Sequence, residues 1–161
     1  MKYLLLLLCV LTFLTLSAKE NDIDLLLKKI KTEKNDTTKV NHLNEIAFYY
    51  LKTNPTLSQK YANEAQSLSI KFKYKKGEGI SLLYLGQLET ENSKLKYSNF
   101  KKALAIFKEL DDKPNKAMAI FRIATIQFAK GDYDNTKIGL NNVLQILKRE
   151  KDKETELFAK T

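Results

Sequence analysis

The feature that most constrains the fold is a helical pattern that returns about every 39 residues. The stretch 120–144, IFRIATIQFAKGDYDNTKIGLNNVL, has a small residue near its start, then a KGDY turn, then apolar residues at helical spacing. The small residue recurs as Ala47, Gly86 and Ala124, at steps of 39 and 38 residues. The segments that follow contain a second recurring set: Ser58, Ala62 and Ala65; Lys96, Phe100 and Ala103; Thr136, Leu140 and Val143. Two marker sets with one period indicate a repeated unit.

The repeated unit is predicted to be a pair of helices. Long stretches without period-two alternation are rich in Leu, Ile, Ala, Lys and Glu, which indicates an all-α chain. Glycines, prolines and capping residues then predict helices at about 37–53, 57–74, 79–92, 96–110, 114–130 and 133–149, with a leading helix at about 21–32 and a further helix from near 153. The short connections predict that consecutive helices are antiparallel neighbours.

Stacking of these hairpins is predicted from the residues on their faces. A small residue at Ala47, Gly86 and Ala124 would let the two helices of a pair approach closely, and a helix-interior glycine, which costs about 1 kcal/mol relative to alanine, needs such a packing reason. The second helices carry apolar stripes: Phe100, Ala103, Leu104 and Phe107; Thr136, Leu140, Val143 and Leu147. One hairpin cannot bury both of its faces, so we expect a right-handed α-solenoid with about three repeats.

Residues 1–18 have the layout of a secretory signal peptide. Lys2 precedes an apolar run at 4–16, and the small residues Ser17 and Ala18 follow it. A run of this length is short for a membrane span, which needs about 20 apolar residues. An uncleaved anchor or a buried helix is the alternative. We therefore expect a periplasmic or secreted protein with a signal peptide at 1–18, a leading helix and linker at 19–36, a repeat domain at 37–152 and the start of a truncated repeat at 153–161.

The single cysteine and the distribution of charge further limit the kinds of protein and partner that we expect. Cys9, the single cysteine, follows Leu8 rather than a small residue, so lipid attachment is not expected, and cleavage would leave no cysteine for disulfides.

The net charge is +9, but the lysines are scattered among acidic residues, which favours a solvated surface. The segments KFKYKKGEG and KLKYSNFKK interleave basic and aromatic residues. We interpret their aromatics as core or turn residues and expect no nucleic acid partner, with binding of nucleic acid or acidic polysaccharide as the alternative.

No set of residues has the spacing of an active site. His42 is the single histidine, Glu45 alone cannot complete a metal site or a catalytic dyad with it, and we expect His42 to be an exposed polar residue. The GDYDN segment lacks the later glycine and glutamate of a calcium loop, so Asp132 is better explained as a helix cap. We expect no enzyme, no metal and no cofactor.

The repeat resembles the tetratricopeptide repeat over about residues 37–149. In its clearest copy, Ala124, Gly131, Asp132, Tyr133 and Thr136 fall at that family's spacing, with threonine where alanine is usual. Tryptophan is absent, and the period exceeds the family's typical ~34 residues. The long, lysine-rich version after a signal peptide is similar to the N-terminal periplasmic repeat regions of Bacteroidetes-type sensor histidine kinases and regulators. Because the pattern stops within a fourth repeat, we expect a truncated copy of a longer protein.

The resemblance implies a concave groove formed by the first helix of each repeat. Its groove-facing positions would be Asn41, Asn44, Phe48, Leu83, Gln87, Met118, Phe121 and Thr125, with Leu51, Thr90 and Phe128 beside them. The mixture of apolar and amide side chains suits an extended peptide or a partner helix. We therefore expect a non-enzymatic module that binds a peptide or partner protein, without a membrane span in the mature chain. The alternative is the sensory part of a histidine kinase or transcription regulator whose output domains are missing.

Overall fold

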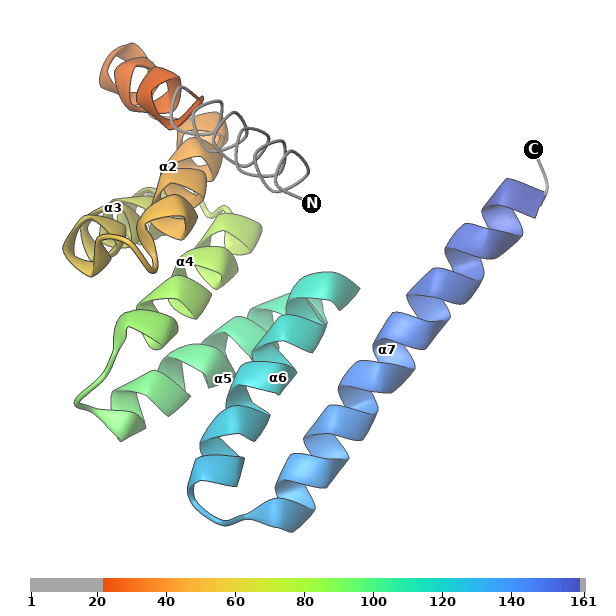
Figure 1. The fold of residues 1–161 in the computed structure, drawn as a ribbon. Coiled ribbons are helices and arrows are strands. Elements are labelled where there is room, and N and C mark those ends of the chain that lie inside the picture. Colours follow the sequence, from red (N-terminus) through yellow and green to blue (C-terminus); the bar gives the residue numbers. More distant parts are fainter. Residues whose placement is uncertain (1–21, 160–161) are drawn as a thin grey trace, which may run out of the picture.

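The structure, a computed structural model, describes the backbone of residues 22–159 and the side chains of residues 22–151. This part of the chain is all-helical, without strands, as predicted (Figure 1). A leading helix is present over 22–32. Six helices follow it: α2 Thr37–Tyr50, α3 Pro55–Lys71, α4 Lys75–Leu88, α5 Ser93–Glu109, α6 Lys113–Ala129 and α7 Tyr133–Ala159. The predicted signal peptide, 1–18, lies outside the described residues.

Each helix from α2 to α7 packs against the next one in the chain, and α2 also contacts α4. Figure 1 shows the hairpins α2–α3, α4–α5 and α6–α7 following one another as a stepped array. The predicted packing of consecutive helices is therefore confirmed, and the arrangement is consistent with a helical repeat. It also places α2, α4 and α6, the first helices of the three hairpins, in succession.

Asparagine or aspartate caps begin five of the helices. The side chains of Asp36, Asn54, Asn92, Asp112 and Asp132 each accept a hydrogen bond from a backbone N–H in the first turn of the following helix. The cap at Asn54 differs from the predicted start at 57, because Pro55 is the first residue of α3 rather than part of the preceding break. Proline ends one helix but suits the first position of the next, where its missing N–H has no helical acceptor.

The same turn ends α3, α5 and α6. A residue with positive φ follows each helix: Lys73 at 54°, Asp111 at 49° and Gly131 at 77°. The next backbone N–H then donates back to a carbonyl in the last helical turn, as from Asp132 to Gln127 over 3.0 Å. This is the Schellman motif, a helix end that favours glycine, and the predicted end of a helix before Gly131 is confirmed.

Gly77 and Gly79, in contrast, lie buried within α4, which begins at Lys75 rather than at the predicted start at about 79. A Cβ at Gly77 would come within 2.7 Å of Ser69 Oγ, and a Cβ at Gly79 would come within 2.7 Å of the ring of Phe107. These glycines admit close neighbours from other helices. Helix packing therefore outweighs their low helix propensity.

The recurring small residues lie at helix contacts, as predicted. Ala47 is fully buried, and its carbonyl accepts a hydrogen bond from Ser58 Oγ at 2.7 Å. A Cβ at Gly86 would come within 2.6 Å of the ring of Phe100. Ala124 is also buried, and a Cβ at Gly139 would come within 3.1 Å of the Ala124 Cβ.

The core consists of two clusters. One joins the leading helix, α2 and α3: Ile23, Ile30, Val40, Leu43, Ile46 and Ala65. The other joins α4, α5 and α6: Leu82, Leu83, Phe100, Ala103, Ile106, Phe107, Ala119, Ile123 and Ile126. The boundary between the two clusters lies at the packing of α4 on α2 and α3.

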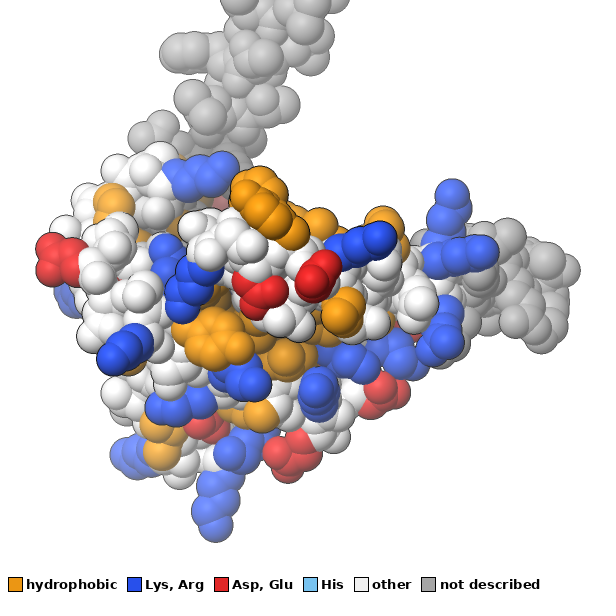
Figure 2. All heavy atoms as spheres, turned by 90° about the horizontal axis from the view of Figure 1, so that it is seen from below, with side chains coloured by type: hydrophobic (Ala, Val, Ile, Leu, Met, Phe, Trp, Pro, Cys, Tyr) orange, Lys and Arg blue, Asp and Glu red, His pale blue; other side chains and the backbone are white. Residues whose placement is uncertain are grey.

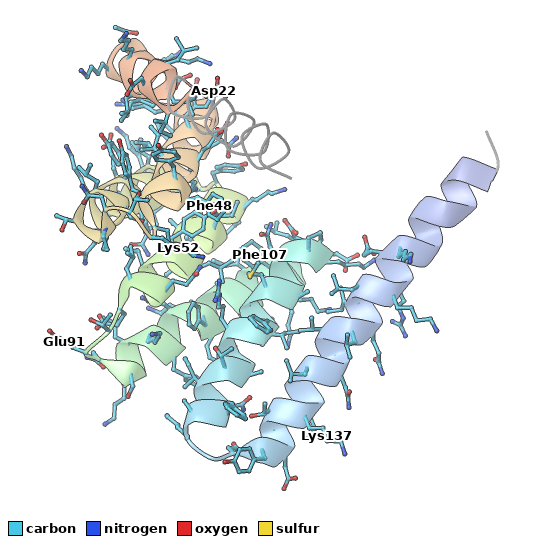
Figure 3. The ribbon with its side chains drawn as sticks, in the orientation of Figure 1. Asp22, Phe48, Lys52, Glu91, Phe107 and Lys137 are labelled. Atoms are coloured by element: carbon cyan, nitrogen blue, oxygen red, sulfur yellow. The ribbon has the colours of Figure 1, made fainter. Side chains whose placement is uncertain are left out.

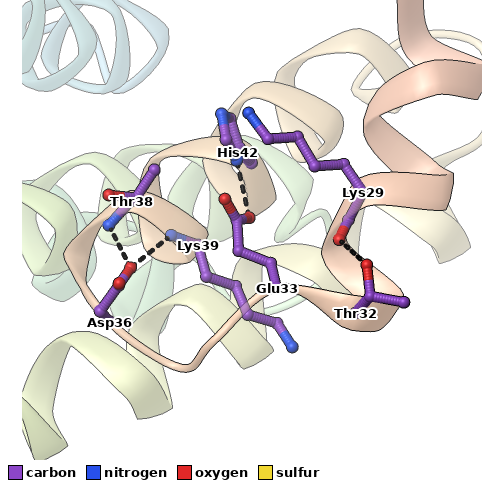
Figure 4. Close-up of polar contacts among 7 residues, drawn as sticks. All are labelled: Lys29, Thr32, Glu33, Asp36, Thr38, Lys39 and His42. Carbon is purple, nitrogen blue, oxygen red and sulfur yellow. Dashed lines mark hydrogen bonds and ion pairs between the residues drawn. The ribbon is translucent and has the colours of Figure 1, made fainter.

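A polar contact ties the leading helix to α2. His42 Nδ1 lies 2.8 Å from Glu33 Oε2, and the two side chains are only 16% and 13% exposed (Figure 4). The expectation that His42 is an exposed polar residue is therefore wrong. The helix break after Thr32 brings Glu33 next to it, which helical periodicity alone could not indicate.

The last helix, α7, differs from prediction in two ways. It runs unbroken to Ala159, whereas a break was expected at 149–154. That segment, REKDKE, is polar but contains no glycine or proline, and its residues are mostly good helix formers. The buried stripe is also rotated by about one residue. Leu140 and Leu147 are 38% and 52% exposed, whereas Thr136 is buried and Gly139 faces Ala124.

Candidate functional site: a groove along α2, α4 and α6

A groove of about 320 Å³ lies across the first helices of the three hairpins. We call it the α2–α4–α6 groove. Its lining residues come from the end of α2, from the middle of α4 and from the first half of α6: Phe48, Leu51, Lys52, Ile80, Leu83, Tyr84, Gln87, Asn115, Met118 and Arg122. Figure 3 places Phe48 and Lys52 where α2 adjoins α4. The stacking of hairpins thus brings residues more than 70 positions apart into one surface.

An exposed aromatic side chain stands in this groove. Phe48 is 57% exposed, and its ring centroid lies 5.9 Å from that of Tyr84. Leu51, Leu83 and Met118 line the same hollow. Large aromatic side chains beside apolar ones are the usual energetic centres of protein interfaces, because they bury much area at a low cost in side-chain entropy.

The groove is basic near α6. Lys52 and Arg122 line it, and no carboxylate does so among the described residues. Burial lowers the pKa of Arg122, and its Nε is buried without a hydrogen-bond partner. The guanidinium also lies over the ring of Phe121, 5.8 Å from its centroid. A carboxylate placed in the groove would be attracted by the positive charges of Lys52 and Arg122.

Near α2, the α2–α4–α6 groove adjoins an acidic hollow. A smaller hollow of about 240 Å³ between the leading helix and α2 is lined in part by Asp22, Glu45 and Phe48. Phe48 therefore lines both hollows. Burial, and secondly the charge of Glu45, raises the pKa of the Tyr84 phenol. The surface changes from acidic to basic across one exposed aromatic residue.

The residues of this charge gradient share one place in the repeat. Glu45, Tyr84 and Arg122 each stand two residues before the small marker of their helix. Sequence reasoning missed Tyr84 and Arg122 because only other positions relative to that marker were considered. It also missed Ile80, although Ile80 has the register of Asn41 and Met118, and that register could have identified it.

The positions of two polar groove residues, Asn115 and Lys52, depend on local structure rather than on the repeat. Asn115 donates its side-chain amide to Asp112 Oδ2 at 2.9 Å, which fixes it at the start of α6. Burial acts to raise the pKa of Asp112, but hydrogen bonds from Asn115 and the charge of Lys76 outweigh it, so the pKa lies below its ordinary value. Lys52 lies in the turn after α2. Neither residue belongs to the repeat register, so periodicity gave no means of finding them.

Four of the eight predicted groove residues line the groove: Phe48, Leu83, Gln87 and Met118. Asn44 does not, since it is buried and donates from Nδ2 to the carbonyl of Gly77 at 3.2 Å. Asn41 is exposed outside the groove and accepts a hydrogen bond from the Tyr74 hydroxyl at 3.0 Å. The structure therefore places Asn44 in the contact between α2 and α4 rather than on the binding surface.

Phe121 and Thr125 also lie outside this groove. Phe121 is 40% exposed beneath the Arg122 guanidinium. Thr125 donates from Oγ1 to the carbonyl of Arg122 at 2.7 Å and borders a separate hollow of about 440 Å³ with Thr90. The predicted surface is therefore divided between two hollows along α4 and α6.

The described residues contain no group of three or more histidine, cysteine, aspartate or glutamate side chains that could hold a metal ion. No helix in the described part of the chain is long and apolar enough to cross a membrane. The sequence matches no family model, and no curated protein or solved structure is significantly similar to it.

Proposed function

We propose that the chain is a non-enzymatic interaction module that binds an extended segment of a partner protein in the α2–α4–α6 groove. The observation that carries this proposal is the exposed Phe48 ring in a groove whose other lining residues come from three successive hairpins. An apolar side chain of the partner would bury Phe48 and displace water from Leu51 and Leu83, which is favourable by about 25 cal/mol per Å² of apolar surface.

The polar residues of the groove define the partner's chemistry. Its backbone amides would pair with the side chains of Gln87 and Asn115, since each amide side chain both donates and accepts. A carboxylate would lie toward Lys52 and Arg122, the two positively charged side chains that line the groove. The partner segment therefore combines an apolar side chain with an acidic one that lies toward α6.

The tetratricopeptide resemblance supports this proposal. In that family the first helices of successive repeats form the concave face of a right-handed solenoid, and α2, α4 and α6 correspond to those helices. The buried markers Ala47, Gly86 and Ala124 occupy the family's small-residue position. We include right-handed stacking and membership of this repeat class in the proposal.

The test is an array of ten-residue peptides with a central Leu or Phe and with Asp or Glu on one side, the other side or neither. We expect binding to prefer one placement of the acid. Phe48→Ser should weaken binding at least about tenfold, because hot-spot aromatics contribute about 2 kcal/mol or more. Arg122→Gln should abolish the preference for the acid, as measured by fluorescence anisotropy.

Matched controls lie outside the groove. Phe72, at the end of α3, is 37% exposed, so Phe72→Ser removes a comparable ring. Lys137→Gln removes a positive charge from α7. Both control variants should bind like the wild type. Equal weakening by Phe48→Ser and Phe72→Ser, or no binding of any peptide in the array, would contradict the proposal.

A further inference from the structure

A larger hollow, of about 450 Å³, lies elsewhere, between α5, α6 and α7. We call it the α5–α7 hollow. It shares no lining residue with the α2–α4–α6 groove. On α6 it is lined by Lys116, Ile120 and Gln127, whereas the groove uses Met118 and Arg122. Residues two positions apart project about 200° apart around a helix, so the two hollows lie on opposite sides of α6.

Three cations converge at one end of the α5–α7 hollow. Lys108 lies near the end of α5 and Lys116 near the start of α6, on either side of the short turn between them. Arg149 of α7 belongs to the same end, because its neighbour Glu150 places Oε1 3.8 Å from Lys113 Nζ at the start of α6. In the described part of the chain, none of these three cations forms an ion pair, and no carboxylate lines the hollow.

The other end of the hollow is polar and uncharged. Gln127 and Asn135 flank the turn between α6 and α7, and Asn142 continues along α7. Lys116 and Gln127 are separated by about 16 Å along α6, from a rise of 1.5 Å per residue. Between the two ends lie Ile120 of α6 and the amides of Asn142 and Gln145 of α7, while Ile138, which is 58% exposed, lies nearer the amide end. The hollow thus has a cationic end, a middle that mixes apolar and amide side chains, and an amide end.

We infer that the α5–α7 hollow binds a small organic anion, with its phosphate or carboxylate group at Lys108, Lys116 and Arg149. Three like charges without counter-charges repel one another, and a bound anion would remove that repulsion. Arginine and lysine together suit phosphate and carboxylate, which accept several charge-assisted hydrogen bonds. Figure 2 shows one face of the molecule, on which lysine and arginine side chains lie beside hydrophobic ones.

The body of this ligand carries hydroxyl groups. The amides of Asn142 and Gln145 both donate and accept hydrogen bonds, as hydroxyl groups require, and they lie about 10 and 6 Å along α7 from Arg149. Ile120 and Ile138 offer apolar contact to the carbon skeleton between the ends. The volume lies within the 300–1,000 Å³ range that is typical of small-molecule sites. An acidic sugar or a sugar phosphate combines these properties.

Four probes separate the contribution of the anionic group to binding from that of the hydroxylated body: glucose 6-phosphate, glucuronate, inorganic phosphate and glucose. The binding of each is measured by calorimetry at constant ionic strength. We expect saturable binding of at least one of the two anionic sugars. That sugar should bind more tightly than inorganic phosphate and glucose, because the anionic group binds the three cations while the hydroxylated body binds the neighbouring amides. Glucose 6-phosphate and glucuronate together distinguish a phosphate ligand from a carboxylate ligand.

The variant that tests the site combines Lys108→Gln, Lys116→Gln and Arg149→Gln, and it should weaken binding at least about tenfold, because it removes all three charged donors that would bind the anion. The control combines Lys102→Gln, Lys137→Gln and Lys148→Gln, which removes the same charge outside the hollow. Equal weakening by the two variants would overturn the inference, as would the absence of saturable binding. Preferred binding of an Asp/Glu hexapeptide over both anionic sugars would also overturn it.

A measurement on the wild type alone guards against misfolding of the triple variant. In NMR titration with the tighter-binding sugar, the side-chain amides of Asn142 and Gln145 should shift, while those of Gln87 and Asn115 in the α2–α4–α6 groove should not. Shifts confined to the groove amides would place the ligand in the other site and contradict the inference.

Discussion

Gly86 shows how a single missing side-chain atom sets the distance between two helices. The ring of Phe100 occupies the space where a Cβ would stand, with contacts of 2.6 and 2.8 Å to two ring atoms. Phe100 is fully buried, so the ring has little room to retreat. The helix tolerates the poor propensity of glycine because the neighbouring helix fills its place.

Gly86→Ala should therefore destabilise the protein although alanine is the better helix former. Overpacking costs about 1–3 kcal/mol, which exceeds the gain in propensity of about 1 kcal/mol. Denaturant unfolding would measure the change. In the Phe100→Leu background, the same substitution should become neutral or stabilising, since the clashing ring is gone. A stabilised Gly86→Ala single variant would show that the contact is not tight.

Residue-scale prediction from the sequence succeeded where a residue's role follows from the repeat. The small markers lie at helix contacts because they hold a fixed place in each unit, and Phe48 lines the groove at the place that the repeat gives it. Asn44 was misassigned, because an amide at a groove position can equally turn inward when a backbone carbonyl such as that of Gly77 is within reach. Periodicity reports which face a residue is on only to within about half a turn of the helix.

At the scale of elements, helix starts were the best predicted features, because capping residues act locally. Asp36, Asn92 and Asp112 begin helices within a few residues of the predicted positions. The length of α7 was not predicted, since a polar run without glycine or proline can be a loop or an exposed helix with the same composition. Only packing against a neighbouring helix decides which face of such a helix is buried.

The buried face of α7 differs from the face predicted from the sequence, and two substitutions distinguish them. Leu144 is 64% exposed, whereas Val143, one residue earlier, is half-buried toward α6. Leu144→Glu should change the free energy of unfolding by less than about 0.5 kcal/mol, as for most surface substitutions. Val143→Glu should cost about 1–3 kcal/mol by burying a polar group. Thermal unfolding of both variants measures the difference, and the reverse order would contradict the observed orientation of α7.

On the scale of the whole molecule, stability is divided between two apolar clusters. Each helix from α2 to α7 contacts its neighbours in the chain, with α2–α4 as the additional contact, so no central core joins all the helices. In such arrays stability is close to a sum of local terms and nearest-neighbour interfaces. The sequence predicted this organisation through its period, but the boundary between clusters depends on which side chains meet, and the period does not contain that information.

Matched substitutions should reveal this division. Ile46→Val lies in the cluster of the leading helix, α2 and α3, and Ile123→Val lies in the cluster of α4, α5 and α6. Each should cost about 0.5–1.5 kcal/mol. Hydrogen exchange should then increase mainly in the helices of the substituted cluster. Equal increases throughout the chain for both variants would instead indicate one cooperative unit.

The unequal lengths of the last two helices have a mechanical consequence. α7 has 27 residues and α6 has 17, so α7 is about 15 Å longer at 1.5 Å per residue. The tight contact at Gly139 and Ala124 lies near the beginning of α7, which makes it a natural pivot. When α7 rotates slightly about that contact, each of its residues moves in proportion to its distance from the contact. The far end of α7 is therefore where a slight rearrangement between α6 and α7 would produce the greatest displacement.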